Sequence, residues 1–309
     1  MNSVKVFSPA TIGNIGPGFD VLGLAICDLG DIIEASIINE NKIIIENIIS
    51  NDSNIPNDPS KNTVSIAAKN VLDLIKTNKG VSFKIKKGIP SGGGLGSSAA
   101  SAAAGAFATN LLFGNILSDQ QILESAMEGE KLVSGSYFAD NVAPALWGGA
   151  TLTQSLNPLV VSKIGSIDEL VIIVITSKIQ LLTQDSRKCL PKTINLNDFV
   201  FNMSNTASIT AAFCKNDYSL LKEALKDKII EPARSKLIPG FKDIKDVAIK
   251  SGADGLAISG SGPTLFAITN SKEKAQTIEK ELSNIFLKNK LECSTFITTC
   301  STKGTTQLY

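Results

Sequence analysis

The order of hydrophobic and polar positions divides the first part of the chain into strands followed by helices. Runs rich in isoleucine and valine predict four early strands, at residues 4–7, 21–27, 32–38 and 43–48. Apolar residues spaced every three or four positions predict a helix over 63–77, and alternation predicts a strand over 81–85. Glycines at 91–96 then open into an alanine-rich segment, 98–113, which we interpret as a buried helix.

The rest of the chain mixes helices and strands without strict alternation. A helix is expected over 118–131 and an irregular loop over 134–149. Further strands are expected at 170–175, 255–259, 264–268 and 292–299, and further helices at 197–214, 220–230, 244–251 and 272–287. This order predicts an α+β architecture in two lobes. We place an N-terminal domain at 1–160 and a C-terminal domain at 161–309.

The bulk composition argues against several classes of partner. The 309-residue chain carries a net charge of +1 and only 6% aromatic residues, so neither a basic surface nor stacking platforms indicate nucleic-acid binding. No signal peptide is evident, and no apolar run reaches the roughly 18–20 residues of a membrane helix. Its five scattered cysteines form no CxxC pair. We therefore expect a cytoplasmic protein with no membrane partner.

Two residue types have an unusual distribution. The chain contains no histidine, which excludes Ser-His-Asp and Cys-His catalysis, HExxH zinc sites and the HRD loop of protein kinases. Any acid–base step must use carboxylates, Lys, Cys, Tyr or the substrate itself. Two of the 30 basic residues are arginines, Arg187 and Arg234. Codon bias toward lysine explains the shortage of arginine, but not where these two residues lie.

The strongest candidate for a binding site is PSGGGLGSSAA at residues 90–100. A glycine run at the start of a helix exposes backbone N–H groups, and the helix dipole favours an anion there by roughly 0.3–1 kcal/mol. The hydroxyls of Ser97 and Ser98 can bind a phosphate oxygen or Mg²⁺. The segment is neither a Walker A loop, since the chain lacks GK[ST], nor a Rossmann fingerprint. A glycine-rich turn without a ligand is the alternative.

Two further glycine-containing motifs lie toward opposite ends of the chain. In PATIGNIGPGFDVLG, residues 9–23, glycines and a proline hold Asn14 and Asp20 in a loop between apolar strands. A fixed amide and carboxylate suit a small polar ligand, and an Asx-stabilised turn is the alternative. In AISGSGPTLF, residues 257–266, a tight turn joins two strands, and by itself it indicates only a hairpin.

Together, the three motifs resemble the GHMP kinase superfamily of small-molecule kinases. PSGGGLGSSAA is similar to its phosphate loop, and SGSGPTLF to its C-terminal glycine motif. Within the superfamily, residues 9–23, GSYFADNVAPALWGG at 135–149 and EPARSKLIPG at 231–240 resemble the homoserine kinases. The resemblance runs in order from residue 3 to about 300. It implies a two-lobed α+β fold, with an N-terminal lobe like ribosomal protein S5 and a ferredoxin-like C-terminal lobe.

The resemblance implies transfer of phosphate from ATP to the side-chain hydroxyl of L-homoserine, on the route to threonine. Adenine would lie near Asn62, and Mg²⁺ would bind to Ser98 and Glu130. Lys87 precedes the loop and would meet phosphate, with a solvated lysine as the alternative. The expected ATP-binding residues are Asn62, Lys87, Pro90, Ser91, Gly92, Gly93, Gly94, Leu95, Gly96, Ser97, Ser98, Ala99, Ala100 and Ser101.

The same resemblance implies a pocket for the substrate. Its expected residues are Asn14, Asp20, Asn141, Thr183, Arg187 and Arg234. Guanidinium groups would bind the homoserine carboxylate bidentately, which lysine cannot do, and Asp20 would bind the ammonium. Thr183 would share a helical face with Arg187.

Chemistry at the hydroxyl is expected to involve four residues: Asn141, Asp140, Glu130 and Arg187. Asn141 would orient the hydroxyl. Asp140 is either a base or a structural residue, because a loose transition state needs little help in removing the proton early.

One position departs from the resemblance. Homoserine kinases usually carry a histidine just before the Ala-Asp-Asn triplet, where this chain has Phe138. Either that contact is dispensable or the pocket accepts another small hydroxylated substrate. The alternatives are thus a related GHMP kinase acting on another small alcohol, or a non-catalytic protein that senses ATP or an amino acid. The resemblance also leaves a homodimer open, since the family often dimerises.

Overall fold

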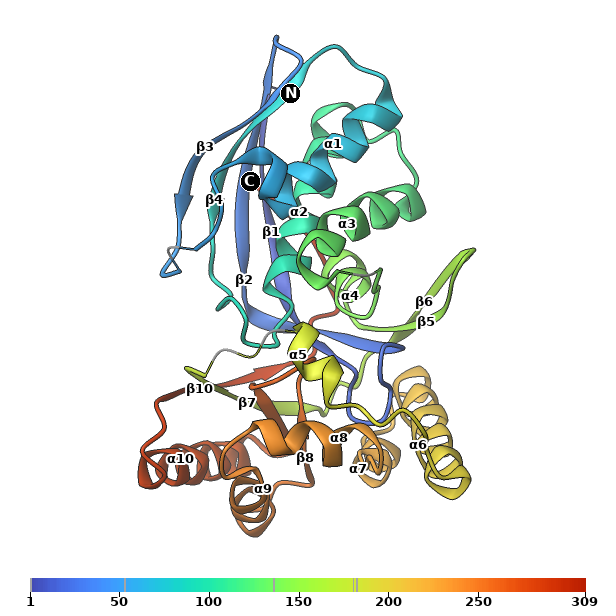
Figure 1. Cartoon of the computed structure of the whole chain (residues 1–309), viewed down its shortest axis with the longest axis vertical. Coiled ribbons are helices and arrows are strands. Elements are labelled where there is room, and N and C mark those ends of the chain that lie inside the picture. The colour runs from blue at the N-terminus through green and yellow to red at the C-terminus, as the bar shows by residue number, and fades with distance from the viewer. Residues whose placement is uncertain (1, 53, 136, 180, 182) are drawn as a thin grey trace.

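The computed structural model describes residues 2–52, 54–135, 137–179, 181 and 183–309, and it arranges them around two sheets (Figure 1). The larger sheet runs in the order β11 (Thr306–Leu308), β1 (Ser3–Gly13), β2 (Leu22–Ile38), β4 (Gly80–Lys86) and β3 (Ile43–Ile49). From β2 it continues through β5 (Ala150–Leu156) to β6 (Leu159–Gly165). The smaller sheet runs β10 (Cys293–Thr299), β7 (Val171–Ser177), β9 (Leu265–Thr269), β8 (Gly255–Ile258), with antiparallel neighbours throughout.

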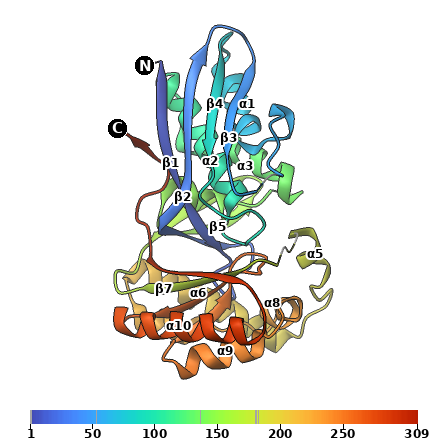
Figure 2. The ribbon, with the colours of Figure 1, turned by 90° about the vertical axis from the view of Figure 1, so that its left-hand side faces the viewer.

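Helices cover the two sheets in separate layers, as Figures 1 and 2 show. The larger sheet carries α1 (Thr63–Ile75), α2 (Ser97–Leu112), α3 (Asp119–Ser134) and α4 (Val142–Trp147). The smaller sheet carries α6 (Leu196–Lys215), α7 (Tyr218–Ala224), α9 (Phe241–Lys250) and α10 (Lys272–Lys288). The short helix α5 (Thr183–Lys188) lies between the two layers, whereas α8 (Ile230–Arg234) lies with the helices of the smaller sheet. Among the described helices, none is long and apolar enough to cross a membrane.

The hydrophobic pattern of each strand matches its place in the sheets. Alternate residues of the first half of β1 are buried against α1 and α2, and the others are exposed, as expected for a sheet with one solvated face. In contrast, β7 is buried on both faces, because α9 and α10 cover one side and a cluster formed by β1, β2, α6 and α7 covers the other. The continuous apolar run of β7 therefore reflects double coverage.

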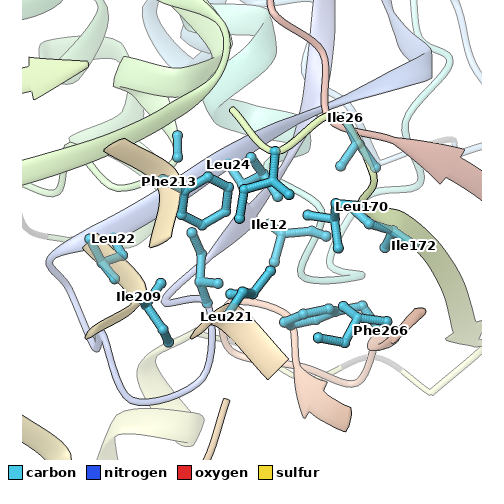
Figure 3. Packing of buried hydrophobic residues seen from close by; sticks show 14 of the residues in the cluster. Ile12, Leu22, Leu24, Ile26, Leu170, Ile172, Ile209, Phe213, Leu221 and Phe266 are labelled. Carbon is cyan, nitrogen blue, oxygen red and sulfur yellow. The ribbon is translucent and has the colours of Figure 1, made fainter. Parts of the chain in front are cut away.

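A shared core joins the two lobes (Figure 3). Residues of β1 and β2 pack in one cluster with residues of α6, α7 and the smaller sheet, among them Ile12, Leu22, Leu24, Ile172, Ile209, Phe213, Leu221 and Phe266. Each of these side chains is almost completely buried. Because the same strands also form the larger sheet, β1 and β2 connect both layers rigidly.

The structure confirms the α+β class, and it changes several expected elements. The two strands expected at 21–27 and 32–38 form the continuous β2, whose register with β1 shifts around Asp28, a residue with a φ of 63°. The irregular loop expected at 134–149 contains α4. The proposed boundary at residue 160 falls within β6, which pairs with β5, and the C-terminal β11 pairs with β1.

The helix expected at 220–230 is two helices, α7 and α8, and the break has a clear cause. The Asp227 carboxylate accepts hydrogen bonds from the backbone N–H groups of Ile229, Ile230 and Glu231, at 2.7, 2.9 and 2.9 Å. It therefore starts a new helix in place of the continuation of α7. This second helix ends at Arg234, whose side chain is 3% exposed and points into the interior.

Candidate active site

A cavity of about 320 Å³ receives side chains from both lobes, a volume typical of small-molecule sites. Of the residues expected from the sequence, it is lined by Asn14, Asp20, Asn62, Lys87, Ser91, Gly92, Gly93, Gly94, Gly96, Ser97, Ser98, Ser101, Glu130, Asp140, Asn141, Arg187 and Arg234. Pro90 is exposed, while Leu95, Ala99 and Ala100 are buried behind the loop, and none of the four lines the cavity. The side chain of Thr183 lies outside the described part of the chain.

The glycine-rich loop owes its shape to close contact with the hairpin between β8 and β9. The Ser259 hydroxyl donates to the carbonyl of Gly94 at 2.6 Å, and the Thr264 N–H donates to that of Gly93 at 3.2 Å. A Cβ atom on Gly94, which has a φ of 83°, would lie 2.5 Å from the Ser259 carbonyl oxygen. Glycine is therefore required there by both conformation and space. The hairpin that the sequence indicated is thus a wall of the cavity.

The loop leads into the N-terminus of α2, where the chemistry suits an anion. Gly96 is the N-cap, and among the described residues no side chain caps this end. The first helical N–H groups have no intrahelical partner, and the helix dipole places partial positive charge on them. Because Ser97 and Ser98 line the cavity, this helix end faces the cavity and suits an anion there.

Lys87 lies beneath this loop, and its ammonium is fully engaged within the protein. It pairs with Asp31 and donates to the Ser97 carbonyl at 2.8 Å and the Ser101 hydroxyl at 2.7 Å. The side chains of Lys87 and Asp31 are 6% and 0% exposed. An ammonium has three N–H donors, so these partners use them all. Lys87 is thus neither solvated nor free to contact a phosphate in this structure, although it was expected to do one or the other.

Asp31 completes this buried group from the opposite side. Its Oδ1 accepts from the N–H groups of Gly88 and Ile89 at 3.0 and 3.2 Å, and its Oδ2 accepts from the Ser101 hydroxyl at 2.8 Å. The carboxylate therefore connects β2 to the start of the loop and to the first turn of α2. Every polar group in the cluster is satisfied, which is the condition under which buried charges are tolerated.

Two buried carboxyl groups face the cavity beyond the loop. Glu130, on α3, hydrogen-bonds with the Ser98 hydroxyl, and burial raises its pKa to about 7. Burial also raises the pKa of Asp140 to about 7, with a further contribution from the negative charge of Asp20, while Arg187 and Arg234 lower it. In this environment both groups titrate near neutral pH.

Arginine side chains form the other end of the cavity. Arg187 donates from Nη2 to Asp20 Oδ1 at 2.7 Å, and Arg234 donates from Nη1 to the Gly260 carbonyl at 2.7 Å. Burial and the positive charge of Arg187 lower the pKa of Arg234. Among the described residues, the buried Nε atoms of both arginines have no hydrogen-bond partner. Buried N–H donors without partners are costly, so this end is prepared for an anionic ligand.

Two phenylalanines orient these guanidinium groups. The Arg187 guanidinium lies 4.0 Å from the centre of the Phe138 ring and 5.3 Å from that of Phe19, and Arg234 lies 4.9 Å from the Phe19 ring. Stacking uses the faces of the guanidinium groups and leaves their N–H edges available. Phe138 therefore supports Arg187 by cation–π contact, in the position where a histidine was expected.

Known proteins resemble this chain over most of its length. The model of the GHMP kinases N-terminal domain matches residues 62–149, and that of the GHMP kinases C-terminal region matches residues 209–289. The homoserine kinase of Chloroherpeton thalassium is 39% identical over 298 residues, covering 93% of both chains. The homoserine kinase of Methanococcus maripaludis is 40% identical, covering 93% of this chain and 92% of its own. The chain belongs to the homoserine kinase family.

Solved structures extend the comparison with this family. The crystal structure of homoserine kinase from Cytophaga hutchinsonii matches with a TM-score of 0.95 and 40% identity, over 100% of this chain and 98% of its own. L. major mevalonate kinase matches with a TM-score of 0.73 at 17% identity, over 97% of each chain. The second match supports the GHMP kinase fold alone. The two-lobed architecture expected from the motifs is thus confirmed.

Asn62, expected near adenine, lies at the start of α1. Asn62 caps α1, accepting from the Val64 N–H at 3.0 Å and donating to the Pro56 carbonyl at 2.9 Å. Ile55 and Ile85 line the cavity beside it. Apolar side chains that suit a base therefore line the same cavity as the glycine-rich loop. The expected adenine site near Asn62 stays a prediction.

Asn14 and Asp20 lie together, held by their own loop. Asn14 donates from Nδ2 to the Gly260 carbonyl at 2.8 Å and accepts from the Asp20 N–H at 3.0 Å. Both residues have positive φ values, 72° and 60°. Asn14 thus has one remaining N–H for a ligand, whereas Asp20 presents a carboxylate already paired with Arg187.

Several residues of the site were not identified from the sequence. Thr11, Phe19 and Asp31 occur in apolar strands or loops, where nothing in the local pattern distinguishes them. The cavity also reaches Lys61 and Ser261. The one signal available in the sequence was a charged residue, Asp31, within an apolar strand. Recognising it as a buried site residue requires knowing which face of the strand is buried.

The buried cluster predicts a large effect of substituting Lys87. Lys87→Met should lower the free energy of unfolding by about 3–5 kcal/mol, because Asp31 is left as an uncompensated buried charge. Thermal and denaturant unfolding would measure the loss. Lys69→Met removes a solvent-exposed ion pair with Asp73 and should cost less than about 1 kcal/mol. A stable Lys87→Met protein with a raised KM for ATP would instead show direct phosphate contact.

Proposed function

We propose that this chain is an ATP-dependent kinase that phosphorylates the side-chain hydroxyl of L-homoserine, giving ADP and O-phospho-L-homoserine. The observation that carries the proposal is a cavity in which a phosphate loop opens directly onto two arginines and a carboxylate. Homoserine kinases with 39–40% identity over more than nine-tenths of this chain support the same substrate.

The phosphate donor would be bound by backbone more than by side chains. The N–H groups of the glycine-rich loop and of the first turn of α2 would hold the phosphate oxygens of ATP. Lys87 would act through the loop, since its three donors hold Asp31, Ser97 and Ser101. Catalysis of this kind depends mainly on positioning and on stabilising negative charge.

Ser98 and Glu130 have the chemistry of a magnesium site. A hydroxyl and a carboxylate are hard oxygen ligands, and hydrogen bonding places them side by side at the phosphate loop. Mg²⁺ commonly takes one or two protein ligands and completes its shell with phosphate and water. Among the described residues no group of three Cys, Asp or Glu gathers as a metal site, so such partial ligation is the arrangement available. Bound there, the ion would neutralise phosphate charge.

The acceptor end would recognise both charges of an amino acid. Arg187 and Arg234, with unpartnered Nε donors, would bind the carboxylate of homoserine. Asp20 would bind the ammonium while keeping its contact with Arg187. Asn141 would then donate to the hydroxyl and direct it toward the phosphate loop. An uncharged alcohol would leave the arginine donors unsatisfied, which disfavours galactose and similar substrates.

The proton of the hydroxyl would pass to Asp140. A carboxylate with a pKa of about 7 is well matched to a base that works near neutral pH. It lies in the same cavity as Asn141, whose Nδ2 is 3.3 Å from Asp140 Oδ2. Asn141 would thus hold the hydroxyl next to its acceptor.

Substrate identity is tested by ADP release from a panel of alcohols. L-homoserine should be phosphorylated far faster than mevalonate, galactose or shikimate. Faster turnover of another alcohol would replace the proposal with a related small-alcohol kinase. Binding of ATP without turnover of any alcohol would instead indicate a sensor.

The carboxylate clamp predicts a selective effect at Arg234. Arg234→Lys should raise KM for homoserine by about tenfold or more and leave KM for ATP within about twofold, since lysine cannot form a bidentate pair. Steady-state kinetics with each substrate varied would measure both constants. Equal increases in the two KM values would contradict the assignment of Arg234 to the acceptor pocket.

A titrating Asp140 predicts a pH dependence. Below about pH 7 the Asp140 carboxyl is protonated and cannot accept a proton, so kcat/KM for homoserine should rise with pH through about 7 and then level off. At saturating Mg²⁺, where a bound cation keeps Glu130 ionised although its pKa is also about 7, Asp140→Asn should lower the rate and abolish this rise. Asp52→Asn, which changes another carboxylate of the cavity, should keep it. A rise that persists in Asp140→Asn would give Asp140 a structural role.

A further inference from the structure

Thr11 links the two halves of the site from beneath. It lies in β1, is completely buried, and donates from Oγ1 to Asn141 Oδ1 at 2.8 Å. Its backbone N–H donates to the carbonyl of Leu95, in the glycine-rich loop, at 3.1 Å. One residue therefore holds both the loop that faces the phosphates and the amide that faces the acceptor hydroxyl.

The Asn141 amide is free for this role because it does not cap a helix. Asn141 is the N-cap of α4, but among the described residues its side chain makes no capping bond. Its oxygen accepts from Thr11, and one N–H points toward Asp140 Oδ2 at 3.3 Å. The second N–H remains for a ligand in the cavity that Asn141 lines. The Thr11 hydroxyl thereby decides which end of the amide faces the ligand.

Two glycines bring the backbone into close contact with this hydrogen bond. A Cβ atom on Gly13 would lie 2.6 Å from Asn141 Nδ2 and 2.8 Å from Asp140 Oδ2. A Cβ atom on Gly96 would lie 2.0 Å from Thr11 Oγ1 and 3.0 Å from Asn141 Oδ1. The hydrogen bond is enclosed between the first strand and the last residue of the phosphate loop, so its geometry is fixed by packing.

We propose that Thr11 is a positioning residue for phosphoryl transfer: its hydroxyl sets the orientation of the Asn141 amide and couples it to the phosphate loop. The inference rests on the proposed function, in which Asn141 donates to the acceptor hydroxyl. Thr11 does not line the cavity, so it acts through Asn141 and not by contact with substrate. Loss of the hydroxyl should affect the reaction more than the binding of ATP.

Two substitutions distinguish the effect of the Thr11 hydroxyl from the effect of the volume of the side chain. Thr11→Val keeps the volume and removes the donor, whereas Thr11→Ser keeps the donor and removes a methyl group. Thr11→Val should lower kcat for homoserine by about tenfold to a hundredfold and leave KM for ATP within about twofold. Thr11→Ser should restore kcat to within about threefold of the native enzyme. Equal losses in the two variants, or native kcat in Thr11→Val, would overturn the proposal.

A double-mutant cycle tests whether Thr11 acts through Asn141. In an Asn141→Ala background, Thr11→Val should change the residual kcat by less than about twofold, because the group that it positions is gone. A further loss as large as that in the native background would show that Thr11 works by another route and would overturn the proposal.

A measurement without turnover keeps this inference separate from the proposed function. The side-chain amide of Asn141 gives a ¹⁵N NMR signal, which should shift in Thr11→Val and stay close to its native position in Thr11→Ser. If the Asn141 signal behaves in this way but the protein does not phosphorylate homoserine, the proposed function is refuted, whereas the hydrogen bond that orients Asn141 is supported. Active enzyme whose Asn141 signal is unmoved by Thr11→Val would retain the function and refute the inference.

Discussion

Asp31 and Lys87 place opposite charges beneath the glycine-rich loop, and the position of that loop depends on their contact. Removing two charges from water is costly, and the cost is offset only when every donor and acceptor finds a partner at good geometry. Here the partners are the backbone of residues 88 and 89, the Ser97 carbonyl and the Ser101 hydroxyl. The loop and the first turn of α2 are therefore held in one arrangement before any phosphate binds, which reduces the ordering cost of binding.

Glycine residues allow the glycine-rich loop to pack directly against the other segments that form the cavity. The segments around residues 13, 94 and 96 approach their neighbours so closely that side chains at these glycines would overlap other atoms. At Gly23 a Cβ atom would lie 1.6 Å from the carbonyl oxygen of Asp140. The three glycine-containing motifs, which look like separate turns in the sequence, therefore pack against one another where the two lobes meet. Its tightness brings groups from both lobes within reach of one small molecule.

Periodicity predicted most regular elements because burial on one face leaves a direct mark on the sequence. It failed where a single contact decides the outcome. Asp227 splits one expected helix into two through three backbone hydrogen bonds, and α4 is too short for its apolar spacing to stand out. The motifs located the cavity, but not the partners that fix its side chains. Thr11, Phe19 and Asp31 contact partners that lie 130, 168 and 56 positions away in the sequence, respectively. No local pattern can reveal contacts over such separations.

The chain has no histidine, but two carboxyl groups at this junction titrate in the pH range where a histidine normally does. Burial raises the pKa values of Glu130 and Asp140 to about 7, where an imidazole would otherwise titrate. The two groups affect each other, since the negative charge of Asp140 is among the causes that raise the pKa of Glu130. A cation that binds near either one must favour its ionised form. Binding of positively charged groups and ionisation of the carboxylates are therefore linked: a bound cation lowers the pKa of a neighbouring carboxyl group, and an ionised carboxylate strengthens the binding of that cation.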